Sequence, residues 1–165
     1  MPTFVTGDLW SQWGHTALLL FTSNSITNRN GSLVMGAGSA LQAARYAPAF
    51  AQEAGAWLTQ TGRVGSIYGL FLTEVAYPMN DSTIVGYQML GALQTKRHWM
   101  EPASLTLIAH SLGRLCQLLE SHTEDYPRVA MPFPGIGYGG LPRAEVLPLL
   151  EPLPSYVHVY EPAKE

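Results

Sequence analysis

Two glycine-rich segments, residues 31–38 and 134–140, constrain the fold of this 165-residue chain most strongly. The first lies between a short apolar run, Ala17 to Phe21, and an alanine-rich helical stretch that begins at Ser39. The second follows another apolar run, Arg128 to Phe133, and also precedes a helical stretch. Such runs are too short for a helix and are typical of buried strands. A strand, a glycine loop and a helix in succession predict an anion site, because glycine lets backbone N–H groups approach a phosphate and the helix N-terminus favours negative charge.

The rest of the pattern predicts further strands and helices in alternation. The helical stretch from Ser39 continues to about Thr59, and Pro48 is expected to end or kink a first helix. Ser104 is a candidate N-cap for a helix whose apolar residues keep helical spacing as far as Leu119. We also expect strands at 65–72, 84–93 and 156–160, a turn at 77–82 and a short helix at 143–150. This alternation predicts an α/β fold with a mainly parallel sheet covered on both faces, and with ligands at the carboxyl ends of the strands.

The composition favours a folded domain over a disordered or nucleic-acid-coating chain. Hydrophobic residues make up 47% of the chain and charged residues 13%, a balance that supports an apolar core. The formal net charge is -3 and the isoelectric point is about 5.9. No global field therefore attracts a polyanion, and we expect no extended nucleic-acid surface. Because no repeat, linker or low-complexity tract interrupts the pattern, we expect a single domain over residues 1–165.

Signals for membrane insertion, secretion or metal binding do not stand out in the sequence. The longest aliphatic and aromatic run, residues 17–21, falls far short of the roughly 18 residues that a membrane span needs. With Cys116 as the single cysteine, no disulfide can form within the chain, and no cysteine and histidine spacing is typical of a zinc site. We therefore expect a cytoplasmic protein with no membrane partner, metal or cofactor.

Several segments, in order along the chain, resemble the macrodomain family. The segment Gly7-Asp8-Leu9 resembles the early Gly-Asp-Ile/Leu of that family, and residues 22–42 resemble its ligand loop and following helix. Residues 135–141 resemble the second ligand loop, while residues 93–99 and 159–162 are similar to segments of the DarG-like subgroup of phage and bacterial macrodomains. The resemblance implies a three-layer α/β/α macrodomain with a central mixed, mainly parallel sheet.

The resemblance also implies a function. A macrodomain of this kind is expected to bind ADP-ribose or a derivative of it and to hydrolyse an ADP-ribosyl linkage or ADP-ribose 1″-phosphate. The partner is then ADP-ribose or an ADP-ribosylated protein, nucleic acid or small molecule. The alternative is a non-catalytic reader or sponge for ADP-ribose or a related signalling nucleotide, which needs the same diphosphate and adenine contacts.

Individual residues take roles from the same resemblance. Asp8 corresponds to the carboxylate that accepts a hydrogen bond from the adenine amino group, which suits an acceptor-only side chain. Asn24 and Asn30 correspond to readers of the distal ribose, although Asn30 in an Asn-Gly pair is also typical of a turn. Lys96 corresponds to a lysine that acts near the scissile bond, so Asn24 and Lys96 are the candidate catalytic residues. The implied ligand contacts along the loops are Leu9, Met35, Gly36, Gly38, Gly135, Ile136, Gly137, Tyr138 and Gly139.

The first glycine loop departs from the pattern of catalytic macrodomains. Ala37 stands where many DarG-like loops carry lysine, and Ser39 and Ala40 stand where other catalytic macrodomains have an acidic residue. The loop from Asn24 to Val34 is also longer than in the DarG-like proteins. Hydrolysis in this chain is therefore expected to be electrostatic, with backbone amides holding the diphosphate while water attacks C1″ or a terminal phosphate.

A second enzyme class competes for part of the sequence. Residues 105–113 resemble the nucleophile elbow of α/β-hydrolases, with Ser111 followed by Asp125 and His158 in the order of a catalytic triad. However, Ala109 replaces the first glycine of the elbow, and few residues separate the serine from the aspartate. The leucine spacing continues through Ser111 and favours one amphipathic helix with this serine buried or partly buried.

Overall fold

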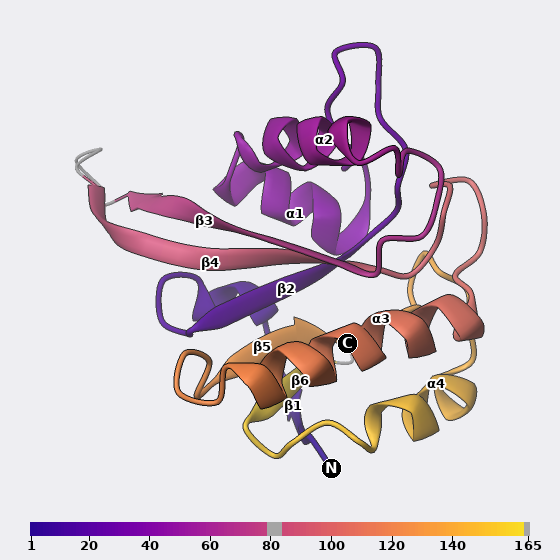
Figure 1. Ribbon diagram of the computed structural model, residues 1–165. Helices are drawn as coiled ribbons and strands as arrows, with labels where there is room; N and C mark the ends of the chain where they lie inside the picture. The colour runs from indigo at the N-terminus through magenta and orange to yellow at the C-terminus, as the bar shows by residue number, and fades with distance from the viewer. Residues whose placement is uncertain (79–83, 164–165) are drawn as a thin grey trace.

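Five mutually parallel strands and one antiparallel edge strand form the centre of the fold in the computed structural model, which describes residues 1–78 and 84–163 (Figure 1). The strands are β1 (Thr3–Thr6), β2 (Leu18–Ser23), β3 (Leu70–Pro78), β4 (Ile84–Gln94), β5 (Val129–Pro132) and β6 (Val157–Glu161). Their order across the sheet is β1-β6-β5-β2-β4-β3, and only the β3–β4 pair is antiparallel. The mixed, mainly parallel sheet is the one expected from the sequence.

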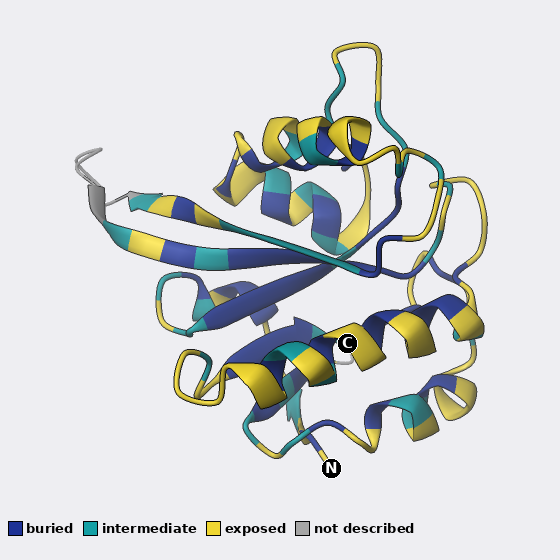
Figure 2. Ribbon diagram, viewed as in Figure 1, coloured by how far each residue is buried: buried dark blue, intermediate teal, exposed yellow. Residues whose placement is uncertain are grey.

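Helices cover both faces of this sheet, which gives the three layers of an α/β/α fold. Helices α1 (Gly38–Tyr46) and α2 (Phe50–Gln60) lie on one face, and α3 (Leu105–Ser121) and α4 (Arg143–Leu150) lie on the other (Figure 1). The helices alternate buried and exposed positions, whereas the central strands are buried on both sides (Figure 2). No helix in the described part of the chain is both long and apolar enough to cross a membrane.

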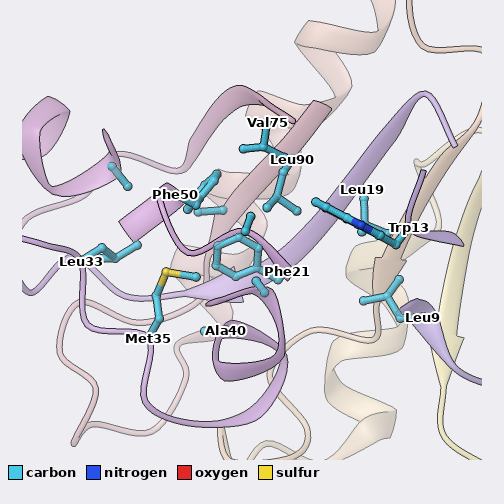
Figure 3. Packing of buried hydrophobic residues seen from close by; sticks show 14 of the residues in the cluster. Leu9, Trp13, Leu19, Phe21, Leu33, Met35, Ala40, Phe50, Val75 and Leu90 are labelled. Carbon is cyan, nitrogen blue, oxygen red and sulfur yellow. The ribbon is translucent and has the colours of Figure 1, made fainter. Parts of the chain in front are cut away.

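Strand β2 supplies both halves of the core because its side chains alternate between the faces of the sheet. Leu19 and Phe21 pack with the residues of α1 and α2, whereas Leu18 and Leu20 pack with those of α3 and α4. All four are fully buried. The ring of Phe21 meets that of Phe50 edge-on, with ring centroids 5.1 Å apart, in the half of the core that packs under α1 and α2 (Figure 3). A strand that is buried on both faces explains why its sequence is continuously apolar.

The predicted helices agree with the structure. The helical stretch is broken into α1 and α2 just around Pro48, as this proline predicts. Helix α3 begins directly after Ser104, whose side chain accepts a hydrogen bond from the Leu107 N–H at 3.2 Å and so caps the helix. Helix α4 has the predicted bounds, 143–150.

One strand prediction is wrong in its position, and two short elements were not predicted. Strand β3 begins at Leu70, so the predicted strand over 65–72 is mostly loop, and Tyr77 and Pro78 belong to the strand rather than to a turn. The cause is a tertiary contact, because the side-chain oxygen of Gln94 accepts the N–H groups of Tyr68 and Gly69. The remainder of the predicted turn lies outside the described residues. The elements without a sequence prediction are β1 and the short 3-10 helix η1 (Leu9–Gln12).

Candidate ligand-binding cleft

A cleft of about 850 Å³ opens at the edge of the sheet where the five parallel strands end. The segments that follow those strands line it, which is the location expected for a ligand of an open α/β sheet. A second cavity of about 440 Å³ adjoins the cleft. Four residues line both cavities, namely Thr22, Thr95, Lys96 and Tyr138. The cleft therefore has a main compartment and a side compartment, which we call the main cleft and the side pocket.

The first glycine loop brings the N-terminus of α1 to the wall of the main cleft. Gly38 lies in the left-handed region with φ +58°, and the preceding N-cap, Ala37, has no side chain to bond the first turn. The hydroxyl of Ser39 instead accepts the Thr22 N–H at 3.1 Å and ties the helix to β2. The amides of the first turn of α1 thus carry no side-chain cap, and the positive end of the helix faces the main cleft.

The second glycine loop presents another group of backbone amides. The N–H groups of Gly140 and Leu141 close the loop onto the carbonyl oxygens of Gly137 and Gly135, at 3.1 and 2.9 Å. The amides of residues 136–138 have no acceptor among the described residues. Residues 136–138 line the main cleft, as do the first two residues of α1. Two groups of N–H donors at one cleft can hold a diphosphate between them.

The glycines of this second loop differ in whether the backbone requires them. A Cβ on Gly139 would lie 2.5 Å from the carbonyl oxygen of Gly135, and a Cβ on Gly135 would lie 2.7 Å from Ile108. Both positions therefore need glycine for the loop to close. Gly137 differs, because its φ is not positive and a Cβ there would meet nothing within 4 Å. We therefore expect the protein to tolerate a small side chain at Gly137, which lines the main cleft.

Asp8 stands at one end of the main cleft and caps η1. One of its carboxylate oxygens accepts the Trp10 N–H at 3.0 Å. The flanking Gly7 and Leu9 line the same end of the cleft, and the N–H of Gly7 is held by the carbonyl oxygen of Glu161 at 2.8 Å. These bonds fix the loop after β1 and leave the second carboxylate oxygen of Asp8 without a hydrogen-bond partner among the described residues. That oxygen is available as an acceptor for a ligand.

Lys96 stands where the main cleft meets the side pocket. It is half-buried and forms no ion pair with any described residue. Burial lowers the pKa of its ammonium group, because the charged form loses part of its hydration. Trp99, half exposed at 50%, lines the side pocket next to it. The His98 ring packs against Trp99 and accepts the Met100 N–H at 3.1 Å, which matches a packing and capping role.

Asn24 lines the side pocket from the end of β2 and is 7% exposed. Its amide oxygen accepts the Ile26 N–H at 2.8 Å, and its amide nitrogen donates to the Val34 carbonyl at 3.1 Å. The side chain therefore holds the two ends of the first loop together. Its second N–H remains the only donor that it can offer to a ligand.

Two predicted contact residues of the first loop lie apart from both cavities. Asn30 is exposed at the loop tip, where the Asn28 side chain accepts its N–H at 3.0 Å, and it lines neither cavity. The tip packs over α2, since a Cβ on Gly55 would overlap the carbonyl oxygen of Gly31. Met35 is buried in the core beside Phe21 (Figure 3). The other predicted contacts, from Leu9 to Gly139, line the main cleft or the side pocket.

Other lining residues had no sequence prediction. Gln42 and Arg45 line the main cleft from α1, and Thr95 and Trp99 line the cavities from the segment after β4. Gln42 follows Gly38 by four residues, so helical spacing places it above the glycine on the same helix face. That spacing is a signal that sequence analysis can use.

The competing nucleophile elbow is not formed. Ser111 lies within α3, is fully buried and donates its hydroxyl to the Gln94 carbonyl at 2.7 Å. Asp125 bonds the His122 ring instead, at 2.9 Å. A serine in the middle of a helix, turned into the core, cannot attack a substrate, and the serine-hydrolase reading is wrong.

Comparison with known proteins agrees with the fold. No protein-family model and no curated protein matches the chain. Among solved structures, the macrodomain of Mycobacterium tuberculosis DarG matches with 26% identity and a TM-score of 0.73, over 99% of each chain. The macrodomain of Thermus aquaticus DarG matches with 25% identity and a TM-score of 0.69, over 100% of this chain and 99% of that one. Thermosipho africanus DarTG in complex with ADP-ribose, at 20% identity and a TM-score of 0.71, covers 95% of this chain and 40% of its own.

These full-length matches show that the chain has the macrodomain fold. Within that class it is similar to the DarG macrodomains of Mycobacterium and Thermus, as the sequence resemblance indicated.

Proposed function

We propose that this macrodomain binds ADP-ribose or an ADP-ribose derivative in the main cleft. The carrying observation is that two groups of backbone N–H donors, at the N-terminus of α1 and in residues 136–138, line one cleft. Because the net charge is -3, the protein as a whole does not attract an anion, and a diphosphate needs a local group of N–H donors such as this one. The cleft volume of about 850 Å³ lies in the range of nucleotide-sized ligand pockets. The DarTG complex with ADP-ribose, which shares the fold, supports the same ligand.

The proposed orientation follows from the chemistry at the two ends of the cleft. Asp8 offers a free carboxylate oxygen, which suits the exocyclic amino group of adenine. The diphosphate then lies between the two groups of amides. The distal ribose reaches Lys96 and Asn24, and the side pocket receives the group attached to C1″.

We further propose hydrolysis of the bond between C1″ and that group. A water oxygen forms a bond to C1″, the bond from C1″ to the acceptor atom breaks, and the departing acceptor gains a proton. Lys96 is half-buried and has no ion-pair partner among the described residues, so its ammonium group can stabilise an anion formed in the cleft. The same scheme covers ADP-ribose 1″-phosphate, where phosphate is the acceptor.

Two observations favour the alternative, a reader that binds without turnover. The side pocket is lined by no aspartate, glutamate or histidine among the described residues, so no side-chain base stands beside the proposed position of C1″. In addition, the Asn24 oxygen is already engaged by Ile26. Binding and hydrolysis therefore need separate experiments.

Binding is tested by calorimetric titration with ADP-ribose. Gly137→Ala adds one methyl group in the main cleft without touching the protein, so we expect at least about tenfold weaker binding through lost phosphate contacts. Gly113→Ala is the matched control, because this exposed position in α3 is equally open and lies outside the cleft. Absence of binding by the unmodified protein at two temperatures would overturn the ADP-ribose proposal.

Hydrolysis is tested with ADP-ribosylated protein, ADP-ribosylated DNA and ADP-ribose 1″-phosphate. An enzyme acting through Lys96 should lose turnover by about 100-fold or more in Lys96→Met, which keeps most of the side-chain volume, while its affinity for ADP-ribose changes far less. If the unmodified protein binds ADP-ribose but releases no product from any of the three, the chain is a reader.

A further inference from the structure

Trp10 connects two polar side chains at the Asp8 end of the main cleft. Its backbone N–H donates to the Asp8 carboxylate at 3.0 Å, and its indole N–H donates to the side-chain oxygen of Gln42 at 2.8 Å. Both Asp8 and Gln42 line the cleft, whereas Trp10 is buried at 5% exposure behind them. One buried residue therefore sets the positions of both.

The tryptophan is itself held firmly by other aromatic rings. It stacks on Tyr46 with ring centroids 4.8 Å apart and ring planes 9° apart, and it meets Trp13 at 6.3 Å. A stacked, buried ring has little freedom to rotate. The indole N–H consequently has a fixed direction, and its hydrogen bond orients the side chain of Gln42.

The bond to Trp10 determines which end of the Gln42 amide is available to a ligand. Because an indole nitrogen is a donor only, the atom of Gln42 that meets it must be the oxygen. The amide nitrogen, with two N–H donors, is the end left for the cleft. Asp8 offers an acceptor and Gln42 offers a donor at the same end of the cleft.

We propose that Gln42, oriented by Trp10, is a base-specificity residue that donates to N1 of the base, the ring nitrogen next to the carbon whose exocyclic amino group is accepted by Asp8. This inference rests on the proposed binding of ADP-ribose. Adenine carries an amino donor beside ring-nitrogen acceptors, which is the complement of this acceptor and donor pair. A hypoxanthine base carries a carbonyl oxygen in place of the amino group and a hydrogen on the adjacent ring nitrogen, so it presents the opposite pattern.

Titration of two ligands against two variants tests the inference. Gln42→Glu keeps an oxygen for the Trp10 N–H but replaces the donor in the cleft by an acceptor. ADP-ribose and inosine diphosphate ribose are titrated into the unmodified protein, Gln42→Glu and Gln12→Glu. The Gln12 variant adds the same charge on η1 at a position that lines neither cavity, and so controls for repulsion of the diphosphate.

We expect Gln42→Glu to reduce the ratio of ADP-ribose affinity to inosine diphosphate ribose affinity by at least about tenfold, the effect of one base-reading pair. In Gln12→Glu this ratio should stay as it is in the unmodified protein. An unchanged ratio in Gln42→Glu would overturn the inference while leaving ADP-ribose binding established. If the unmodified protein fails to bind ADP-ribose, the proposed function itself fails, and the two failures are distinguished within one experiment.

Discussion

The ring of Tyr138 lies over Gly38, with a ring carbon 3.4 Å from the position that a Cβ on Gly38 would occupy. Tyr138 is 81% exposed and lines both the main cleft and the side pocket, so it spans the gap between the two glycine loops. This contact connects a residue of the second loop to the first residue of α1. It also places an aromatic ring at the border of the two compartments.

Removal of this ring should weaken binding without weakening the fold. Tyr138→Ala is expected to reduce ADP-ribose affinity about 3- to 10-fold through lost aromatic contact. Its thermal unfolding midpoint should hardly change, because the side chain is mostly exposed. Tyr87→Ala, at another exposed tyrosine on β4, is the control. Equal affinities of the Tyr138 and Tyr87 variants would show that the ring takes no part in binding.

Lys96 should titrate at lower pH than a free lysine. The chain has two lysines, Lys96 and Lys164, and the latter lies outside the described residues. After reductive ¹³C-methylation, the Lys96 signal should have a midpoint below that of a free methylated lysine in an NMR titration, because burial lowers its pKa. Lys164→Arg assigns the signals. ADP-ribose should raise the Lys96 midpoint, since an anion stabilises the charged form.

The lowered pKa of Lys96 also predicts how the stability of the fold changes with pH. The folded state releases the Lys96 proton more readily than the unfolded state, so the unfolded chain binds more protons between the folded pKa and 10.5. This group therefore favours folding more as pH rises through that window. Unfolding midpoints of the unmodified protein and Lys96→Met, compared across the window, should converge as pH rises.

Two glycines within helices should respond in opposite ways to alanine. In a helix interior, alanine is normally more stable than glycine by roughly 0.5–1 kcal/mol, and Gly113→Ala should follow this rule because a Cβ there meets nothing within 4 Å. Gly55→Ala should instead destabilise the protein by about 1–3 kcal/mol, because its Cβ would overlap the Gly31 carbonyl. Thermal unfolding measures both changes. A stabilised Gly55 variant would contradict the packing of the loop tip on α2.

Ser111 should behave as a structural residue. Ser111→Ala is expected to cost about 1 kcal/mol, because the buried Gln94 carbonyl loses a hydrogen bond. Any ADP-ribosyl hydrolase activity should remain close to that of the unmodified protein. A fluorophosphonate probe should leave the protein unlabelled, and labelling at Ser111 would contradict its burial in α3.

Sequence patterns revealed the elements whose stability is local. The continuous apolar run at Leu18–Phe21 and the Ser104 cap with its helical spacing each carry their own signal. The start of β3 was misplaced because the Gln94 side chain, more than 20 residues further along the chain, orders the backbone at Tyr68. No local pattern contains that contact.

In the candidate site, too, local features could be predicted from the sequence and features that depend on tertiary contacts could not. The two glycine loops and Asp8 could be found from the sequence, since their chemistry is carried by short segments. The positions of Asn30 and Met35 relative to the cavities could not be found from the sequence. Packing of the first loop on α2 and in the core turns these two residues away from the cavities. Helical spacing from Gly38 could have placed Gln42 at the cleft, but the orientation of its amide depends on Trp10, which lies 32 residues away in sequence.

The parallel sheet has a consequence for how binding and folding depend on each other. The main cleft is assembled from stretches that begin at Gly7 and extend to Ala163, each contributed by the end of a different strand or by a neighbouring helix. No single segment among the described residues forms the cleft, so a partly folded molecule does not have it. A small ligand of the cleft therefore binds only folded molecules. Such a ligand stabilises the whole domain against unfolding and can act as a pharmacological chaperone.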